Sequence, residues 1–375
     1  MNHSAARRLY RDTPLSAAAY WMMLALTCIA LYVSPLHHLE YVVPFIALIV
    51  GLADGRFTLG GVNAPFVFLL VTGLALSPQA DSDGFKDLYF IWSGVSAALV
   101  LQKTPIKPKL FFMVFTGGTV LFAVLFGGLL HGFVFDIALS ESSFEGNFGF
   151  LFGLLAIYAG MKRQYWICIL SVVWAVLALK RIVLVALLAC GLAYLLPERI
   201  ARRVLNPIGM LAINLGVILC IVLYANHQFD WWIAYFTGQS ANQLGMGRQE
   251  LYGAVTHDIF YDPLGHLLLG AGPGAGYEKL AYFGASNLHS DLLKIVFEYG
   301  IVIFGAFVWL GYRMRDVRVR IMFLYANILY ATDNVLIYHF FLFFLCLFAR
   351  AIESEPAVAR SNVRDQEPEA MHAIS

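Results

Sequence analysis

The chain has 375 residues, of which 60% are hydrophobic and 13% are charged. An average soluble domain has about 25% charged residues, so a soluble core could not absorb the apolar runs that recur along this chain. The composition therefore predicts an integral membrane protein and excludes a soluble enzyme. The net charge of +1 points to no particular partner, and we expect none that is nucleic acid. The five cysteines all fall inside apolar runs, with neither a disulfide framework nor a metal-ligand spacing, so we expect no metal and no cofactor.

Apolar runs along the chain predict an all-α polytopic fold with about twelve membrane-spanning helices. They lie near 14–33, 38–53, 57–76, 88–102, 110–133, 148–161, 165–179, 182–196, 205–225, 291–312, 316–332 and 334–349. The first run lacks the small-residue cleavage site of a signal peptide, so we expect a retained helix. Residues 321–349 fit either one long helix or two, and Asp333 near their middle favours two.

Positive charges recur in alternate loops, which sets the expected orientation. With residues 1–13 in the cytoplasm, all but six of the 25 Lys and Arg fall on the cytoplasmic side. The exceptions are Lys86, Lys180, Arg181, Arg248, Lys279 and Lys294. This arrangement gives helices within 14–225, one large periplasmic loop at 226–290, further helices within 291–349 and a disordered cytoplasmic tail at 350–375.

Lys180 and Arg181 are two positive charges between the apolar runs 165–179 and 182–196. A Lys or Arg at the centre of a membrane helix costs about 2.5–3.5 kcal/mol on insertion scales. The basic clusters that flank these runs, Lys162-Arg163 and Arg199 to Arg203, are both predicted to be cytoplasmic. The two runs therefore form a hairpin with Lys180 and Arg181 at its outer tip. Each arm of about 15 residues reaches about 22 Å, short of the roughly 30 Å hydrocarbon layer. We expect the tip to bind an anion; the alternative is a pair that reaches headgroups.

The large outer loop holds most of the polar chemistry. It opens with an aromatic cluster typical of headgroup depth, composed of Phe229, Trp231, Trp232, Tyr235 and Phe236. A glycine-rich run follows at 270–276, without the Lys-Ser/Thr or the preceding strand of a phosphate loop. Two interpretations stay open for this run: a tight turn that folds back on the membrane, or backbone N–H groups that line a diphosphate.

His289 lies at the start of the span that begins at Ser290 and Asp291. The positive end of a helix dipole favours a neutral imidazole and a nearby anion, and a neutral imidazole can act as a general base. Asp291, Lys294 and Glu298 share one face of this helix. They indicate either a wet cavity or a structural ladder of ion pairs.

Four short motifs occur in order between Gly247 and Gly300. They are Gly247-Arg248, Pro263-Leu264-Gly265, Gly270-x-Gly272-x-Gly274, and His289-Ser290 followed by nine residues and Gly300. This stretch resembles the periplasmic loop and following helix of the bacterial O-antigen polymerase and O-antigen ligase superfamily. Arg181 resembles the Ser-Arg element of that family, with Lys180 in place of the serine.

The resemblance implies a GT-C-like, metal-independent inverting glycosyltransferase of the bacterial inner membrane, with undecaprenyl-diphosphate-linked oligosaccharide as donor. It implies that His289 is the general base that deprotonates the acceptor hydroxyl. Arg181, Arg248 and Lys180 then bind the diphosphate leaving group. The expected supporting residues are Asp291, Glu250, Gly272, Gly274 and Lys279. Membrane lipids and a chain-length regulator are further expected partners.

The acceptor distinguishes the candidate functions. We expect a polymerase that transfers the growing glycan to another lipid-linked repeat unit. A ligase that transfers it to lipid A-core is the closest alternative, and transfer to a protein hydroxyl is a third. A secondary transporter is a different class, in which Asp291, Lys294, Glu298 and Asp333 form a coupling path. A transporter predicts paired broken helices or inverted repeats, and the sequence contains no such pattern. A structural scaffold would not explain Arg181.

Overall fold

The computed structural model describes residues 14–55, 57–100, 106–126, 129–136, 141–285 and 287–355. It is about 80% helical. Within these residues the strands are one antiparallel pair, β1 (Phe135–Asp136) and β2 (Glu141–Ser142). The predicted all-α class is therefore confirmed. The N-terminal residues 1–13, Arg56, Lys103 and most of the predicted tail lie outside the described residues.

Each of the twelve predicted apolar runs overlaps a helix of the described structure. In chain order these helices are α2 (Pro14–Tyr32), η1 with α3 (Ser34–Val42, Val43–Asp54), η2 with α4 (Gly61–Asn63, Ala64–Ala75), α5 (Ser82–Val100), α6 (Pro108–Leu125), α7 (Phe148–Met161), α8 (Tyr165–Leu177), α9 (Arg181–Leu195), α11 (Pro207–Ala225), α16 (Asp291–Tyr312), α17 (Val317–Thr332) and α18 (His339–Glu353). The connections hold the short helices η3 (Ser77–Gln79), η4 (Leu129–His131), α10 (Glu198–Val204) and η6 (Val335–Ile337).

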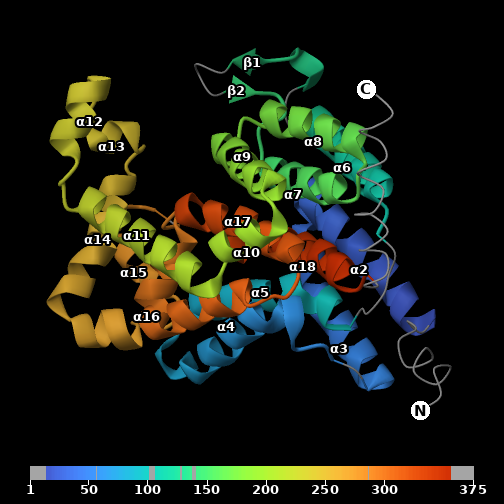
Figure 1. The fold of residues 1–375 in the computed structure, drawn as a ribbon, viewed down its shortest axis with the longest axis horizontal. Helices are drawn as coiled ribbons and strands as arrows, with labels where there is room; N and C mark the ends of the chain where they lie inside the picture. Colours follow the sequence, from blue (N-terminus) through green and yellow to red (C-terminus); the bar gives the residue numbers. More distant parts are fainter. Residues whose placement is uncertain are drawn as a thin grey trace.

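The segment between α11 and α16, predicted as the large outer loop and called the outer loop below, is itself helical. It contains α12 (Asp230–Thr237), α13 (Ala241–Leu244), α14 (Arg248–Tyr261), the π-helical segment η5 (Pro263–Leu269) and α15 (Ala275–Ala281). Figure 1 shows α12 and α13 at one end of the molecule, and α2 and α3 toward the other. Helix α14 packs on α11, and η5 packs on α16, so the loop folds back against the spans.

Five helical segments of the described structure are long and apolar enough to cross a membrane. They are Leu15–Tyr32, Ser34–Asp54, Pro108–Leu125, Pro207–Ala225 and Asp291–Tyr312. Four shorter apolar helical segments accompany them: Gly61–Ala75, Phe148–Met161, Tyr165–Leu177 and Arg181–Leu195. The peripheral helices α8, α9 and α11 leave large apolar side chains exposed, including Trp166, Leu195 and Ile208. Such apolar outer faces suit a lipid environment and agree with a membrane protein.

Helix α18 forms the centre of the bundle, where aromatic rings fill the core. The ring centroids of Phe115 and Phe344 are 4.8 Å apart, and Phe348 stacks on Tyr158 at 4.6 Å. Helix α18 packs against α5, α7 and α17. Aromatic pairs of this kind add about 0.5–1.5 kcal/mol beyond their buried area, so they fix how the helices meet.

Ion pairs join several helix ends at one side of the bundle. Glu355 accepts from Lys162 after α7 and from Arg318 Nη1 at 2.7 Å near the start of α17. Since Glu355 follows α18, this contact makes α17 and α18 an antiparallel hairpin, with the break at Asp333 at the opposite side. Arg320 Nη1 donates to the carbonyl of Leu205 at 3.1 Å, which brings the start of α11 to the same side.

Helix α16 is interrupted at Gly300, which has φ 82° and ψ 162°. A Cβ atom at this position would lie 2.3 Å from the carbonyl oxygen of Leu268 in η5. Only glycine accommodates both the positive φ and this close approach. Gly300 therefore allows η5 of the outer loop to pack directly on α16.

Candidate functional site

His289 lies at the N-terminal end of α16, opposite the ion-paired side of the bundle. Ser290 caps this helix by accepting from the backbone N–H of Leu293 at 3.3 Å. His289 itself has φ 55°, a left-handed conformation that is uncommon for residues other than glycine. The Tyr252 hydroxyl of α14 donates to the His289 carbonyl at 3.0 Å. Burial raises the pKa of Tyr252 to about 12, so this hydroxyl stays protonated and holds His289 in place.

Arg248 is the first residue of α14 in the outer loop, and its side chain extends toward the end of α17, near His289. Its Nη1 donates to the carbonyl of Thr332, the last residue of α17, at 3.0 Å. Gly247, with φ 81°, precedes it and turns the chain into the helix. The Gly-Arg motif therefore directs a guanidinium onto the α17–α18 turn, beside His289.

Lys180 and Arg181 form the sharp link between α8 and α9. The turn requires φ 51° at Leu179, and Arg181 begins α9 with an exposed side chain. Lys180 is half-buried, and its Nζ lies 5.7 Å from the centroid of the Phe150 ring in α7. Its charge therefore faces inward from the hairpin tip, toward the start of α7.

Arg248, Lys180 and Asp333 all lie close enough to His289 to affect its pKa. Burial lowers the pKa of His289, and the positive charges of Arg248 and Lys180 lower it further, while Asp333 acts in the opposite direction. The imidazole is therefore neutral at physiological pH and can accept a proton. We refer to His289, Arg248, Lys180 and Asp333 as the outer cluster, after the side of the membrane predicted for it; Arg181 follows Lys180 in the chain.

Asp291 and Asp333 connect α16 to the α17–α18 turn beneath the outer cluster. The Asp291 carboxylate accepts from the backbone N–H of Leu336 at 2.7 Å, and the Asp291 N–H approaches the Asp333 carbonyl at 3.3 Å. Asp291 is fully buried. These contacts position the turn. Asp333 contributes a negative charge that acts on His289, a role that the sequence did not assign to it.

The glycine run binds α16. The N–H groups of Ala271 and Gly272 donate to the carbonyls of Phe297 and Glu298 at 2.8 and 2.9 Å. The Glu298 carboxylate also accepts backbone N–H groups of this run, including that of Gly276 at 3.3 Å. Gly274 lies so close to Asp81 that a Cβ atom would be 1.9 Å from its Oδ1. These contacts match the tight-turn interpretation and leave Gly272 and Gly274 outside the cluster.

Glu250 and Lys279 also make their contacts elsewhere. The exposed Glu250 accepts from Asn242 at 2.8 Å, and Lys279 pairs with Asp258 at 2.7 Å. Asp258 lies near the far end of α14, almost three helical turns from Arg248. The structure thus brings together His289, Arg248 and Lys180, with Arg181 adjacent, but not Gly272, Gly274, Glu250 or Lys279.

Lys294 has a partner that the sequence did not indicate. It pairs with Asp87 of α5, 207 residues away, and its Nζ lies 3.9 Å from Glu298. The Tyr277 hydroxyl of α15 also donates to Asp87 at 2.9 Å. This network is the structural alternative foreseen for Lys294 and Glu298, and it fixes the outer loop to α5 and α16.

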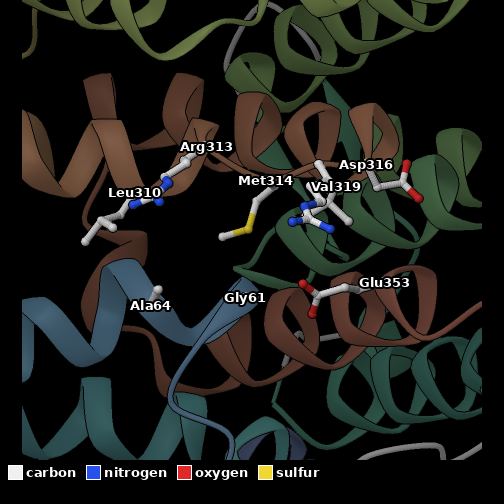
Figure 2. Close-up of a pocket in the computed structure, with 9 residues that line it drawn as sticks. Gly61, Ala64, Leu310, Arg313, Met314, Asp316, Val319 and Glu353 are labelled. Atoms are coloured by element: carbon white, nitrogen blue, oxygen red, sulfur yellow. The ribbon is translucent and has the colours of Figure 1, made fainter.

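A pocket of about 490 Å³ lies at the other end of the same helices (Figure 2). It is lined by residues that include Arg313 after α16, Asp316 before α17 and Glu353 at the end of α18. The Glu353 side chain points toward Gly61 in this view. None of the residues expected in the site lines this pocket, so it is separate from the outer cluster.

The arrangement defines what chemistry the outer cluster can perform. Arg248 and Lys180 lie near the neutral imidazole of His289, where the ends of α9, α14, α16 and α17 meet. Among the described residues, no group of three His, Cys, Asp or Glu side chains could hold a metal ion. No family model, curated protein or solved structure matches this chain. Its own residues indicate a site that binds an anion and accepts a proton beside it.

Proposed function

We propose that this chain is an inverting glycosyltransferase that polymerises undecaprenyl-diphosphate-linked oligosaccharide repeats. The observation that supports this best is the placement of Arg248 and Lys180 around a neutral His289. A lipid diphosphate supplies the anion, and an acceptor sugar hydroxyl supplies the proton. The motifs between Gly247 and Gly300 add the resemblance to the O-antigen polymerase and ligase superfamily.

In the proposed reaction, His289 accepts the proton of an acceptor hydroxyl as its oxygen attacks the anomeric carbon of the donor glycan. The bond between that carbon and the diphosphate oxygen breaks, and the configuration at the carbon inverts. Negative charge develops on the departing diphosphate, which Arg248, Lys180 and Arg181 stabilise. General-base assistance of this kind contributes about 100- to 10,000-fold to the rate.

The proposed topology has about twelve spans in a GT-C-like arrangement, with the outer cluster on the periplasmic side of the inner membrane. Two observations support it. Each predicted span overlaps a helix, and the basic residues Lys162, Arg318 and Arg320 meet at the side opposite the cluster. A surplus of Lys and Arg marks the cytoplasmic side of membrane proteins.

The decisive experiment compares a host that lacks this gene with the same host complemented by it. Polysaccharide is separated on gels, and lipid-linked glycans are extracted from membranes. We expect long polymer only with the complementing chain, and single lipid-linked repeats without it. If the host without the gene accumulates long unattached polymer instead, the chain is a ligase. If neither the polymer nor the lipid-linked glycans change, the glycosyltransferase proposal is wrong.

A further inference from the structure

A second buried polar pair lies near the outer cluster and has no part in the transfer step. His339, the first residue of α18, places Nδ1 2.6 Å from Oε2 of Glu40 in η1. The two residues are only 5% and 8% exposed. Removing such a pair from water is unfavourable, and packed apolar side chains are often as stable in its place. The pair therefore calls for an explanation beyond stability.

The contact with Glu40 shows which nitrogen of the His339 imidazole carries a hydrogen. A carboxylate only accepts hydrogen bonds, so His339 Nδ1 donates to it. The other ring nitrogen, Nε2, is buried and has no hydrogen-bond partner among the described residues. An unsatisfied buried polar atom is destabilising, and a ligand hydroxyl within reach of Nε2 would satisfy it.

Both members of the pair line a cavity of about 450 Å³. Its walls come from α2, η1, α5, α6, the start of α7 and the η6–α18 junction, and its lining includes the rings of Phe90, Phe122, Phe148, Tyr338 and Phe340. The size falls within the roughly 300–1,000 Å³ of small-molecule sites, which combine apolar walls with a few polar groups. A sugar ring presents the complementary surfaces, since it has apolar C–H faces and a rim of hydroxyls.

Tyr338 connects this cavity to the outer cluster. It lines the cavity, and its ring centroid lies 6.2 Å from that of Phe150. Phe150 in turn faces Lys180 Nζ at 5.7 Å. Two aromatic rings therefore separate a ligand in the cavity from Lys180 of the outer cluster.

We infer that this cavity is a glycosyl-binding subsite, where Glu40 and His339 bind hydroxyls of a sugar in the acceptor glycan other than the sugar that His289 deprotonates. The inference rests on the proposed function and adds the place where the acceptor binds. Glu40 and His339 act here as binding residues, while His289 remains the base.

Saturation-transfer NMR on the full chain in nanodiscs tests this subsite without requiring turnover. The probes are the methyl glycosides of glucose, galactose, mannose and N-acetylglucosamine. We expect at least one to bind the wild type, and Glu40→Gln and His339→Gln to weaken its binding about five- to tenfold, as for one lost hydrogen bond. Leu31→Trp narrows the cavity without altering the pair and should also reduce binding. The melting temperature of each variant separates lost contacts from misfolding.

Two control variants have to keep wild-type binding. They are Glu353→Gln and Asp316→Asn, both at the opposite end of the bundle. The inference is overturned if no glycoside binds the wild type, or if Leu31→Trp and His339→Gln bind as the wild type does. Displacement of the glycoside by a lipid-linked repeat or by a core oligosaccharide supports the subsite and identifies the source of the sugar.

If glycoside binding depends on Glu40 and His339 but the chain makes no polymer, the subsite is supported and only the polymerase proposal is rejected. If the chain makes polymer but its cavity binds no glycoside, the polymerase proposal is supported and the subsite is rejected. The two proposals therefore fail separately.

Discussion

Positively charged side chains have different partners at the two ends of the helix bundle. At one end, Arg318 pairs with both Asp316 and Glu355, and Lys162 shares Glu355. At the other end, Arg248 donates to a backbone carbonyl and Lys180 faces an aromatic ring. Among the described residues, neither Arg248 nor Lys180 forms an ion pair with a carboxylate.

This difference separates charges that hold the fold together from charges that are available to a ligand. A guanidinium or ammonium without a carboxylate partner retains most of its attraction for an anion. Unpaired ionisable groups also shift the pKa values of their neighbours, as Arg248 and Lys180 do for His289. The predictions below test this distinction, from the largest expected effect to the smallest.

The largest effect is expected for His289→Asn. Asparagine tolerates the left-handed backbone at φ 55°, so the variant removes the base and keeps the turn. We expect transfer to fall about 100- to 10,000-fold with little change in stability. Polymer length in the complemented host and transfer by purified protein both measure this, with membrane abundance as the control. Full activity would show that His289 is not the base.

Arg248→Gln should reduce transfer by about 100- to 1,000-fold, because a cation that stabilises the leaving group is lost. Glutamine can still donate a hydrogen bond to the Thr332 carbonyl, so the melting temperature should stay close to that of the wild type. The measurement is kcat/KM with a lipid-linked donor. Equal losses of stability and activity would assign Arg248 to the fold.

Arg320→Met tests the other end of the bundle. Arg320 Nε and Nη1 donate to the carbonyls of Met314 and Leu205, which lose their partner in the variant. We expect the free energy of unfolding to fall by about 1–3 kcal/mol. The activity of the folded fraction should not change. Thermal unfolding in detergent and kcat per folded molecule provide the two readouts; a lower kcat with normal stability would contradict the distinction.

The smallest effect is a shift in pH dependence. Since the base must be neutral, activity rises with pH through the His289 pKa, which lies below the usual value of about 6.5. Lys180→Met removes a positive charge, raises this pKa and moves the acid limb to higher pH. Asp333→Asn moves it to lower pH, each by less than about one pH unit. Rate profiles between pH 5 and 8 measure both, and shifts in the same direction would contradict the assignment.

Hydropathy predicted the positions of the helices because it depends only on residues that are close in the sequence. Each predicted run overlaps a helix, and the split at Asp333 matches the end of α17 at Thr332. Hydropathy missed some boundaries, and one of them is instructive. Helix α5 begins at Ser82 instead of residue 88, because Asp87 is buried within the helix by its pairing with Lys294. No local pattern contains that partner.

The candidate site was predicted in part. The sequence alone singled out His289, Arg248, Lys180 and Arg181, because charged and imidazole groups next to apolar runs require a reason. It also placed Gly272, Gly274 and Lys279 in supporting roles, but the structure directs them to α16, Asp81 and Asp258. On the sequence alone, Asp333 had a place only in the transporter path, and Glu40 and His339 had none. Glu40 and His339 lie within apolar runs without a motif around them.

By itself, the sequence determined that the chain is a helical membrane protein with charges where lipid makes them costly. Composition and hydropathy suffice for this, since burial of apolar surface acts on every segment in the same way. Tertiary structure alone decided which charges are paired and which face His289. Pairing depends on distances of a few ångströms between helices that are far apart in the chain, as between Asp87 and Lys294. Those distances are set by packing of the whole bundle, which no single segment encodes.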